Sequence, residues 1–225
     1  EVGGSRSLPR PPPTGSFRGV APSSKPRIDS VVTLADGRDL AYSEWGDPDG
    51  RPLALHHGSP GSRLMCPDVE ATVDAGFRLF SFDRPGYGRS DPKPGRSTVD
   101  VVSDLTELCD RFEIGPCPVV GWSGGGGYAL ACGWADPERY PQVVLVASPG
   151  PRSEMDEASD GLTALSRGFA ERLRAGDRTA EIEVRERLAP YAENPKAMLA
   201  EGPKGPDGHM FAIPEVVEAL GTMWE

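Results

Sequence analysis

The stretch from Val119 to Leu130 constrains the fold of this chain more than any other part of its sequence. It runs from an apolar pair into Gly121-Trp122-Ser123-Gly124-Gly125, and small and apolar residues follow. This order predicts a strand, a tight turn and a helix. Glycines two residues before and two residues after the serine remove Cβ atoms that would collide in so sharp a turn. We therefore expect Ser123 at the end of a strand, above the free amides of a helix N-terminus.

The composition argues against several classes of partner. The 225 residues carry a formal net charge of −10, whereas a protein that binds nucleic acid or an anionic membrane needs a basic surface. No apolar run reaches the roughly 18 residues of a membrane-spanning helix, and no secretory leader is visible. The glycines from Gly124 to Gly127 are not followed by the Lys-Ser or Lys-Thr of a phosphate-binding loop. No nucleic acid, membrane or nucleotide partner is predicted.

The cysteines are scattered along the chain. No Cys-x-x-Cys pair occurs among Cys66, Cys109, Cys117 and Cys132. We expect free buried or half-buried thiols in a reducing compartment, hence a cytoplasmic protein with no metal site.

The sequence divides into three parts. Residues 1–26 are rich in Pro, Gly, Ser and Arg, and we expect a disordered tail because they cannot bury enough apolar surface. Residues 27–150 alternate between short apolar runs and helical patterns. Residues 151–225 read as short charged helices, which we expect to form a cap or lid. Its last apolar stripe, which includes Leu220 and Trp224, is still open at Glu225, so we expect a truncated cap.

Strand and helix patterns alternate through the middle part. Strand patterns cover residues 30–34, 40–45, 52–56, 77–82, 119–122 and 143–147, and helical patterns cover 63–75, 98–112 and the residues up to 135. Such alternation is typical of parallel crossovers. The expected fold is α/β: a mostly parallel sheet with helices on both faces.

Two more loops follow strand ends in this region. His56-His57-Gly58-Ser59-Pro60-Gly61 ends one buried strand, and Asp83-Arg84-Pro85-Gly86-Tyr87-Gly88-Arg89-Ser90 ends the next. Together with the Ser123 turn, and in this order, these stretches resemble the α/β-hydrolase superfamily, especially its proline-iminopeptidase and small-ester-hydrolase members. The resemblance covers residues 28–151 well. The part that follows is similar in placement to the helical cap of that family.

The resemblance implies a serine hydrolase that cleaves a small ester or amide through an acyl-enzyme on Ser123. It implies an oxyanion hole made by the backbone N–H groups of Ser59 and Gly124, and no cofactor. His57 and Trp122 lie next to these residues in the sequence and are candidates for lining the substrate pocket. The alternative for Ser123 is an inert serine in a turn.

The remaining titratable residues near these motifs favour structural roles. His56 and His57 lie on the strand that leads to the oxyanion loop, where we expect a histidine to pack its ring and bond loop backbone rather than to move a proton. Asp83 is expected to fix the loop from Arg84 to Ser90, with the role of triad acid as the alternative. The family order is serine, then acid, then histidine on a loop after the last strand.

That acid and that histidine are not evident downstream. His209 is the only later histidine and falls in the cap region, and Glu154 and Asp156 follow the last strand only loosely. The last strands of the family fold are also expected to be missing. Without a proton acceptor the serine hydroxyl is a poor nucleophile.

Three hypotheses therefore remain open. The protein is a hydrolase whose acid and base lie beyond Glu225, or a non-catalytic binding module on the same fold, or a non-hydrolytic oxidative or lyase relative. A sheet that ends at residues 143–147 is expected to expose an apolar edge. We therefore expect the isolated chain to be marginally stable, and to form a homo-oligomer or bind a complementing C-terminal segment.

Overall fold

The computed structural model describes residues 25–59 and 61–150, and positions 168, 171–172, 175–180, 182–183, 186 and 189. Every structural statement below concerns these residues. Pro60, nearly all of the predicted tail and most of the predicted cap lie outside them, as do Glu154, Asp156 and His209.

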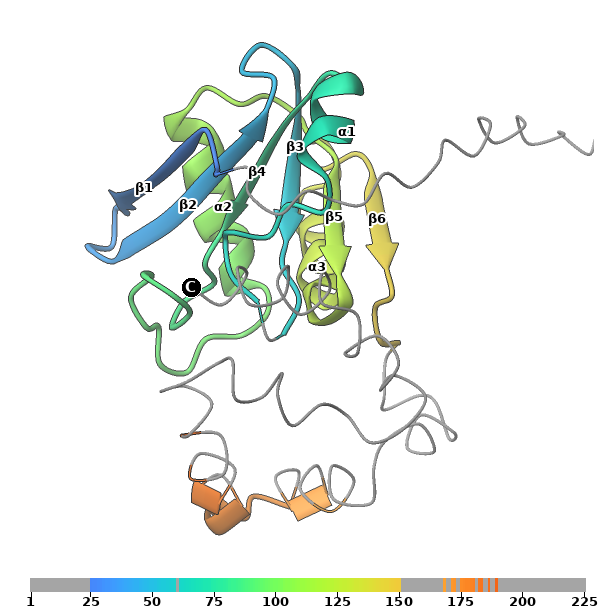
Figure 1. Cartoon of the computed structure of the whole chain (residues 1–225). Coiled ribbons are helices and arrows are strands. Elements are labelled where there is room, and N and C mark those ends of the chain that lie inside the picture. The colour runs from blue at the N-terminus through green and yellow to red at the C-terminus, as the bar shows by residue number, and fades with distance from the viewer. Residues whose placement is uncertain are drawn as a thin grey trace, which may run out of the picture.

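Six strands form one mixed sheet in the order β1-β2-β4-β3-β5-β6, with β1 and β6 at opposite edges (Figure 1). The first two pairs, β1–β2 and β2–β4, are antiparallel, and the other three pairs are parallel. This confirms the predicted strands and the mostly parallel sheet. Their bounds are β1 Ile28–Thr33, β2 Asp39–Gly46, β3 Arg51–His56, β4 Phe77–Phe82, β5 Val119–Trp122 and β6 Val143–Val146.

Three α-helices connect the parallel strands: α1 (Val69–Asp74), α2 (Asp100–Arg111) and α3 (Gly126–Ala135). The predicted helix over residues 63–75 is too long, because α1 begins only after Asp68. The side chain of Asp68 caps this helix by accepting a hydrogen bond from the Ala71 amide. Residues 63–67 form turns instead, since the backbone and guanidinium of Arg63 are held by the carboxylate of Asp83.

Side chains alternate between the two faces of the sheet, as the strand period requires. On one face, Phe80 and Phe82 pack with Leu105 of α2 and Ala129 of α3. On the other face, a smaller cluster contains Trp45, Leu55, Met65 and Leu79, and half-buried Val69 of α1 packs against it. Helices therefore cover both faces, as predicted. Full burial of one such leucine or phenylalanine stabilises the fold by roughly 1.5–3 kcal/mol.

The β6 edge carries exposed apolar side chains. Val144 is 48% and Leu145 is 45% exposed, although both lie in the strand. This agrees with the expected apolar edge, while the marginal stability of the isolated chain stays a prediction.

The cysteines confirm a further expectation. All four cysteines are free, and three of them are buried. Within the described part of the chain, no helix has both the length and the apolar character needed to cross a bilayer.

Candidate active site

Ser123 stands at the sharp turn that follows β5. Its φ of 48° lies in the left-handed region, which non-glycine residues rarely adopt. One 3-10 turn, Ser123–Gly125, leads directly into α3. Backbone strain of this kind costs on the order of 1–3 kcal/mol and is typical of functional sites. The strand, turn and helix predicted from the sequence are confirmed.

The glycines around Ser123 are required by close backbone contacts. A Cβ atom on Gly121 would lie 2.6 Å from the Cα of Gly126. A Cβ atom on Gly125 would lie 2.1 Å from the carbonyl oxygen of His56, at the end of β3. Both distances are far below van der Waals contact, so the Gly-x-Ser-x-Gly spacing has the steric cause that we predicted.

Ser59 lies directly against Gly124. A Cβ atom placed on Gly124 would be 2.9 Å from the Oγ of Ser59 and 3.3 Å from its backbone nitrogen. The structure thus brings together two of the residues singled out by the sequence, Ser59 and Gly124, and Gly124 directly follows Ser123. Ser59 is exposed, so a molecule arriving from solvent can reach it.

Arg84 holds the loop that carries Ser59. Its guanidinium donates hydrogen bonds to the carbonyl oxygen of His57, to that of Gly58 at 2.9 Å, and to the Oγ of Ser59 at 2.9 Å. The charge also lies 4.7 Å from the ring centres of both Tyr87 and Tyr128. The residue is 0% exposed. Sequence reasoning treated Arg84 only as part of a loop, because nothing in the local pattern separates a buried arginine from a solvated one.

Asp83 fixes the loop from Arg84 to Ser90 and ties it to Arg63. Its carboxylate accepts hydrogen bonds from the Arg89 amide at 3.0 Å and from the amide and guanidinium of Arg63 at 2.7 and 2.9 Å. Gly88 is needed here, because a Cβ atom on it would lie 2.1 Å from the Oδ2 of Asp83. The predicted structural role of Asp83 is confirmed by these contacts.

The two adjacent histidines are buried and engaged elsewhere. The Nε2 of His56 lies 3.4 Å from the Sγ of Cys132, and the Nδ1 of His57 lies 2.8 Å from the carbonyl oxygen of Gly58. Burial, assisted by the nearby charge of Arg84, lowers the pKa of each imidazole to about 3. Such weak bases are poor proton acceptors near neutral pH. Their predicted structural role therefore has direct support.

Trp122 and His57 were the two pocket-lining candidates. Trp122 is half-buried and packs against the cluster of Trp45, Leu55, Met65 and Leu79 on one face of the sheet. His57 is 0% exposed, and the edge of its ring meets Tyr87 with ring centres 5.3 Å apart. The role of either residue in a substrate pocket stays a prediction.

Tyr87 is a further residue of this region that the sequence did not single out. Its hydroxyl lies 3.4 Å from the Oγ of Ser59. Burial raises the pKa of Tyr87, but hydrogen bonds with Ser59 and Arg84, together with the charge of Arg84, outweigh burial and lower it. An aromatic ring inside a Gly-rich loop is the only sequence signal for this residue.

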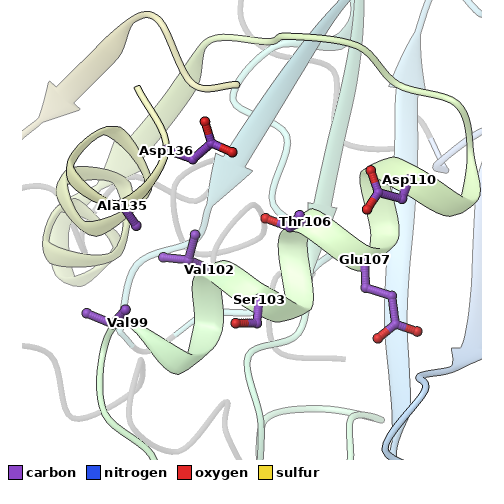
Figure 2. A pocket seen from close by; sticks show the side chains of 8 residues that line it. All are labelled: Val99, Val102, Ser103, Thr106, Glu107, Asp110, Ala135 and Asp136. Carbon is purple, nitrogen blue, oxygen red and sulfur yellow. The ribbon is translucent and has the colours of Figure 1, made fainter. Parts of the chain in front are cut away.

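A separate groove of about 350 Å³ lies between α2 and α3. In Figure 2, Val99 and Val102 of the α2 region face Ala135 at the end of α3, while carboxylates of Glu107 and Asp110 line the rest of α2. None of the residues around Ser123 lines this groove. It is therefore not the site that the sequence motifs build. Nowhere in the described residues do three or more His, Cys, Asp or Glu side chains gather so as to hold a metal ion.

Comparison with known proteins identifies the family. Residues 51–189 match the family model described as the alpha/beta hydrolase fold. The chain is 33% identical over 139 residues to the non-heme chloroperoxidase of Streptomyces lividans, covering 59% of this chain and 49% of that protein. It is 31% identical over 139 residues to a proline iminopeptidase of Xylella fastidiosa, covering 57% and 42% respectively.

A solved structure has the same fold over more of the chain. A hydrolase from Pseudomonas aeruginosa is 26% identical, with a TM-score of 0.50 over 87% of this chain and 71% of that one. The fold, the strained serine and the family match together show that the chain belongs to the α/β-hydrolase fold family. It spans about half the length of the curated relatives that it matches.

Proposed function

We propose that this protein is a serine hydrolase that cleaves a small ester or amide through an acyl-enzyme on Ser123. The observation that carries the proposal is the left-handed Ser123 at the end of β5, with Ser59 packed against the next residue, Gly124. The amides of Ser59 and Gly124 are the proposed donors to the oxyanion. Proline iminopeptidases among the relatives support the hydrolase reading.

The proposed reaction has two displacement steps. The Oγ of Ser123 attacks the substrate carbonyl carbon and its proton passes to a base; the leaving group then departs as an alcohol or amine after it takes up a proton. Water next attacks the acyl-enzyme, which releases the acid and restores the hydroxyl. Two fixed amides stabilise the charge on the carbonyl oxygen, and each contributes roughly 3–4 kcal/mol.

The two described histidines do not supply the base for this reaction. Of the described histidines, His56 is engaged with Cys132 and His57 with Gly58, and neither makes a hydrogen bond to Ser123. The proposal therefore requires a proton acceptor from residues outside the described ranges. A non-catalytic binding module on the same fold is the alternative that this observation favours.

A fluorophosphonate probe separates these two functions. In a hydrolase, the Oγ of Ser123 bonds to phosphorus, fluoride leaves, and the hydroxyl proton is transferred to the base. We expect labelling of the purified protein, none in Ser123→Ala, and unchanged labelling in Ser103→Ala, an exposed serine on α2. Ester hydrolysis by Ser123→Ala should fall on the order of a million-fold. Failure of the unaltered protein to react would favour the binding module.

A second candidate function comes from the similarity to the Streptomyces lividans chloroperoxidase. Halogenation of a phenolic probe in the presence of peroxide and chloride would reveal this activity, and ester hydrolysis without it would count against it. For either function we propose a cytoplasmic protein with a small-molecule substrate and no resident cofactor.

A further inference from the structure

The side-chain hydroxyl and the backbone amide of Ser59 both lie beside Gly124, the residue that follows Ser123. Both the Oγ and the backbone nitrogen of Ser59 come within 3.3 Å of one point, the position of a Cβ atom on Gly124. The hydroxyl and the amide of Ser59 therefore lie close together beside Gly124, so an oxygen that accepts a hydrogen bond from this amide is within reach of the hydroxyl as well. The same side chain is exposed, so substrate can reach it.

The hydroxyl proton of Ser59 is not used in the hydrogen bond between Ser59 and Arg84, so it is available to a ligand. A guanidinium has donors only, so the Oγ of Ser59 must accept the 2.9 Å hydrogen bond from Arg84. A hydroxyl oxygen has two acceptor positions. Either hydroxyl can donate across the 3.4 Å between Ser59 and Tyr87, and when Tyr87 donates, both acceptor positions of the Ser59 oxygen are filled. The O–H of Ser59 then has no need to turn toward the protein and can point at a ligand.

The charge of Arg84 makes this hydroxyl a stronger donor. Arg84 is fully buried, and none of its described partners is a carboxylate: they are two carbonyl oxygens, the hydroxyls of Ser59 and Tyr87, and two aromatic rings. A hydrogen bond from an ionised donor polarises the group that accepts it, and low local dielectric strengthens the effect. An ion pair at Arg84 would have weakened it.

We propose that the hydroxyl of Ser59 is a third donor to the oxyanion formed at Ser123, and that Arg84 orients and polarises it. This inference rests on the proposed hydrolase function. Ser59 is thereby a catalytic residue through its side chain as well as its amide, and Arg84 is a positioning residue. The proton of Ser59 is shared with the oxyanion and stays on its oxygen, so no bond is broken in this step.

Substitution of Ser59 tests the proposal, because alanine removes the hydroxyl and keeps the amide. Hydrolysis of p-nitrophenyl acetate by Ser59→Ala should lose about a hundredfold or more in kcat with little change in KM, since one oxyanion donor is worth roughly 10²–10³ in rate. Phosphonylation of Ser123 by a fluorophosphonate should slow in parallel. Ser59→Thr restores a hydroxyl and should recover most of the rate.

Two controls separate this role from a structural one. Ser103→Ala makes the same chemical change on the exposed face of α2, and we expect the rate of the unaltered protein. Ser59→Ala should keep the melting temperature of the unaltered protein, which a loosened loop would lower. A full rate in Ser59→Ala, or a threonine variant as slow as the alanine one, would overturn the proposal while labelling of Ser123 left the hydrolase function standing. No labelling of the unaltered protein would remove both.

Discussion

Two buried arginines lie at the same end of the sheet, and their surroundings differ. Arg63 pairs with two carboxylates: its Nη1 lies 2.9 Å from Asp83, and its Nε lies 2.6 Å from Asp29. Arg84 follows Asp83 directly in the chain, yet its guanidinium meets backbone carbonyls, the Ser59 hydroxyl and two tyrosine rings. The buried charge of Arg63 is neutralised by carboxylates, whereas the buried charge of Arg84 has no carboxylate partner.

The difference separates a structural cluster from an electrostatic one. Around Arg63 the charges cancel once Arg89 is counted, because two guanidinium groups meet the two carboxylates of Asp83 and Asp29. The result is a rigid connection between the loops that follow β3 and β4. The positive charge of Arg84 is not neutralised, and it affects the neighbouring histidines. Burial is the main cause of the low pKa of His56 and of His57, and the charge of Arg84 is the second cause. The uncompensated charge lies on the side of the loop that carries Ser59.

Loss of Arg63 should produce the largest change in stability. Arg63→Met leaves the fully buried carboxylate of Asp83 without its cationic partner, which costs about 3–5 kcal/mol. Urea unfolding measures this cost. The matched control is Arg89→Met: this guanidinium lies 3.8 Å from Asp29 with its side chain 55% exposed, and we expect a loss of about 1 kcal/mol or less. Equal losses would show that burial of Asp83 does not matter.

Acid should destabilise the fold through the two histidines beside Arg84. Their pKa values are lowered from 6.5 to about 3, chiefly by burial and then by Arg84. Below about pH 6.5 both histidines bind a proton in the unfolded chain, whereas in the folded chain they stay neutral until the pH is close to 3. Stability is therefore complete above that pH and falls by about 1.4 kcal/mol per pH unit for each histidine as the pH drops toward 3.

Urea unfolding at several pH values between about 7 and 5 measures this slope. Replacing His57 with glutamine should remove one histidine's share. In measurements extended to about pH 3, Arg84→Met should make the loss of stability level off at a higher pH, because removal of the charge lets the folded-state pKa of both imidazoles rise. A slope that His57→Gln leaves unchanged would mean that groups other than this histidine cause the loss of stability.

The sequence predicted the features that depend on local rules. Apolar runs located every strand, and the glycine spacing located the turn at Ser123, because a Cβ atom at Gly121 or Gly125 meets backbone directly. Both patterns lie within short stretches of the sequence, so they can be recognised without knowledge of distant contacts. The role of Asp83 followed from its position after a strand, for the same reason.

The features that depend on distant contacts were not predicted. The helix expected over residues 63–75 lost its first turns because Arg63 is held by Asp83, a tertiary contact that periodicity does not contain. The contacts of Arg84 with Tyr87 and Tyr128 join the loop after β4 to helix α3, which lies far away in the sequence. An arginine beside a proline and a glycine reads as a solvated loop residue, whereas this one is fully buried.

Loss of Arg84 should cost less stability than loss of Arg63. Arg84→Met leaves the carbonyl oxygens of His57 and Gly58 without this donor, and an unsatisfied buried polar group costs about 1–3 kcal/mol. No carboxylate is left unpaired, and a desolvated charge is removed, which offsets part of the cost. Urea unfolding of both arginine variants compares them. If Arg84→Met were as damaging as Arg63→Met, the distinction between the two clusters would fail.

The smallest expected change in stability comes from loss of the contact between the Tyr128 ring and the guanidinium of Arg84. Tyr128→Leu should cost about 1–2 kcal/mol through the lost cation–π contact, more than the same contact costs at an exposed site. Phe77→Leu provides the comparison, because the guanidinium of the exposed residue Arg51 lies 4.5 Å from the ring centre of Phe77. Tyr128→Phe keeps the ring and loses only the hydroxyl that accepts a hydrogen bond from Arg96.

A double-mutant cycle isolates the interaction from the packing that leucine also removes. When Arg84 is already methionine, Tyr128→Leu removes no contact with a buried guanidinium, although Arg96 still lies 5.9 Å from the ring centre, and it should cost less by about 1 kcal/mol or more. The cycle for Phe77 with Arg51→Met should close within about 0.5 kcal/mol, because solvent screens that pair. Equal coupling in the two cycles would mean that the charge of Arg84 is screened as well. A screened charge could not polarise Ser59, so this smallest measurement bears on the electrostatic difference between the two arginines.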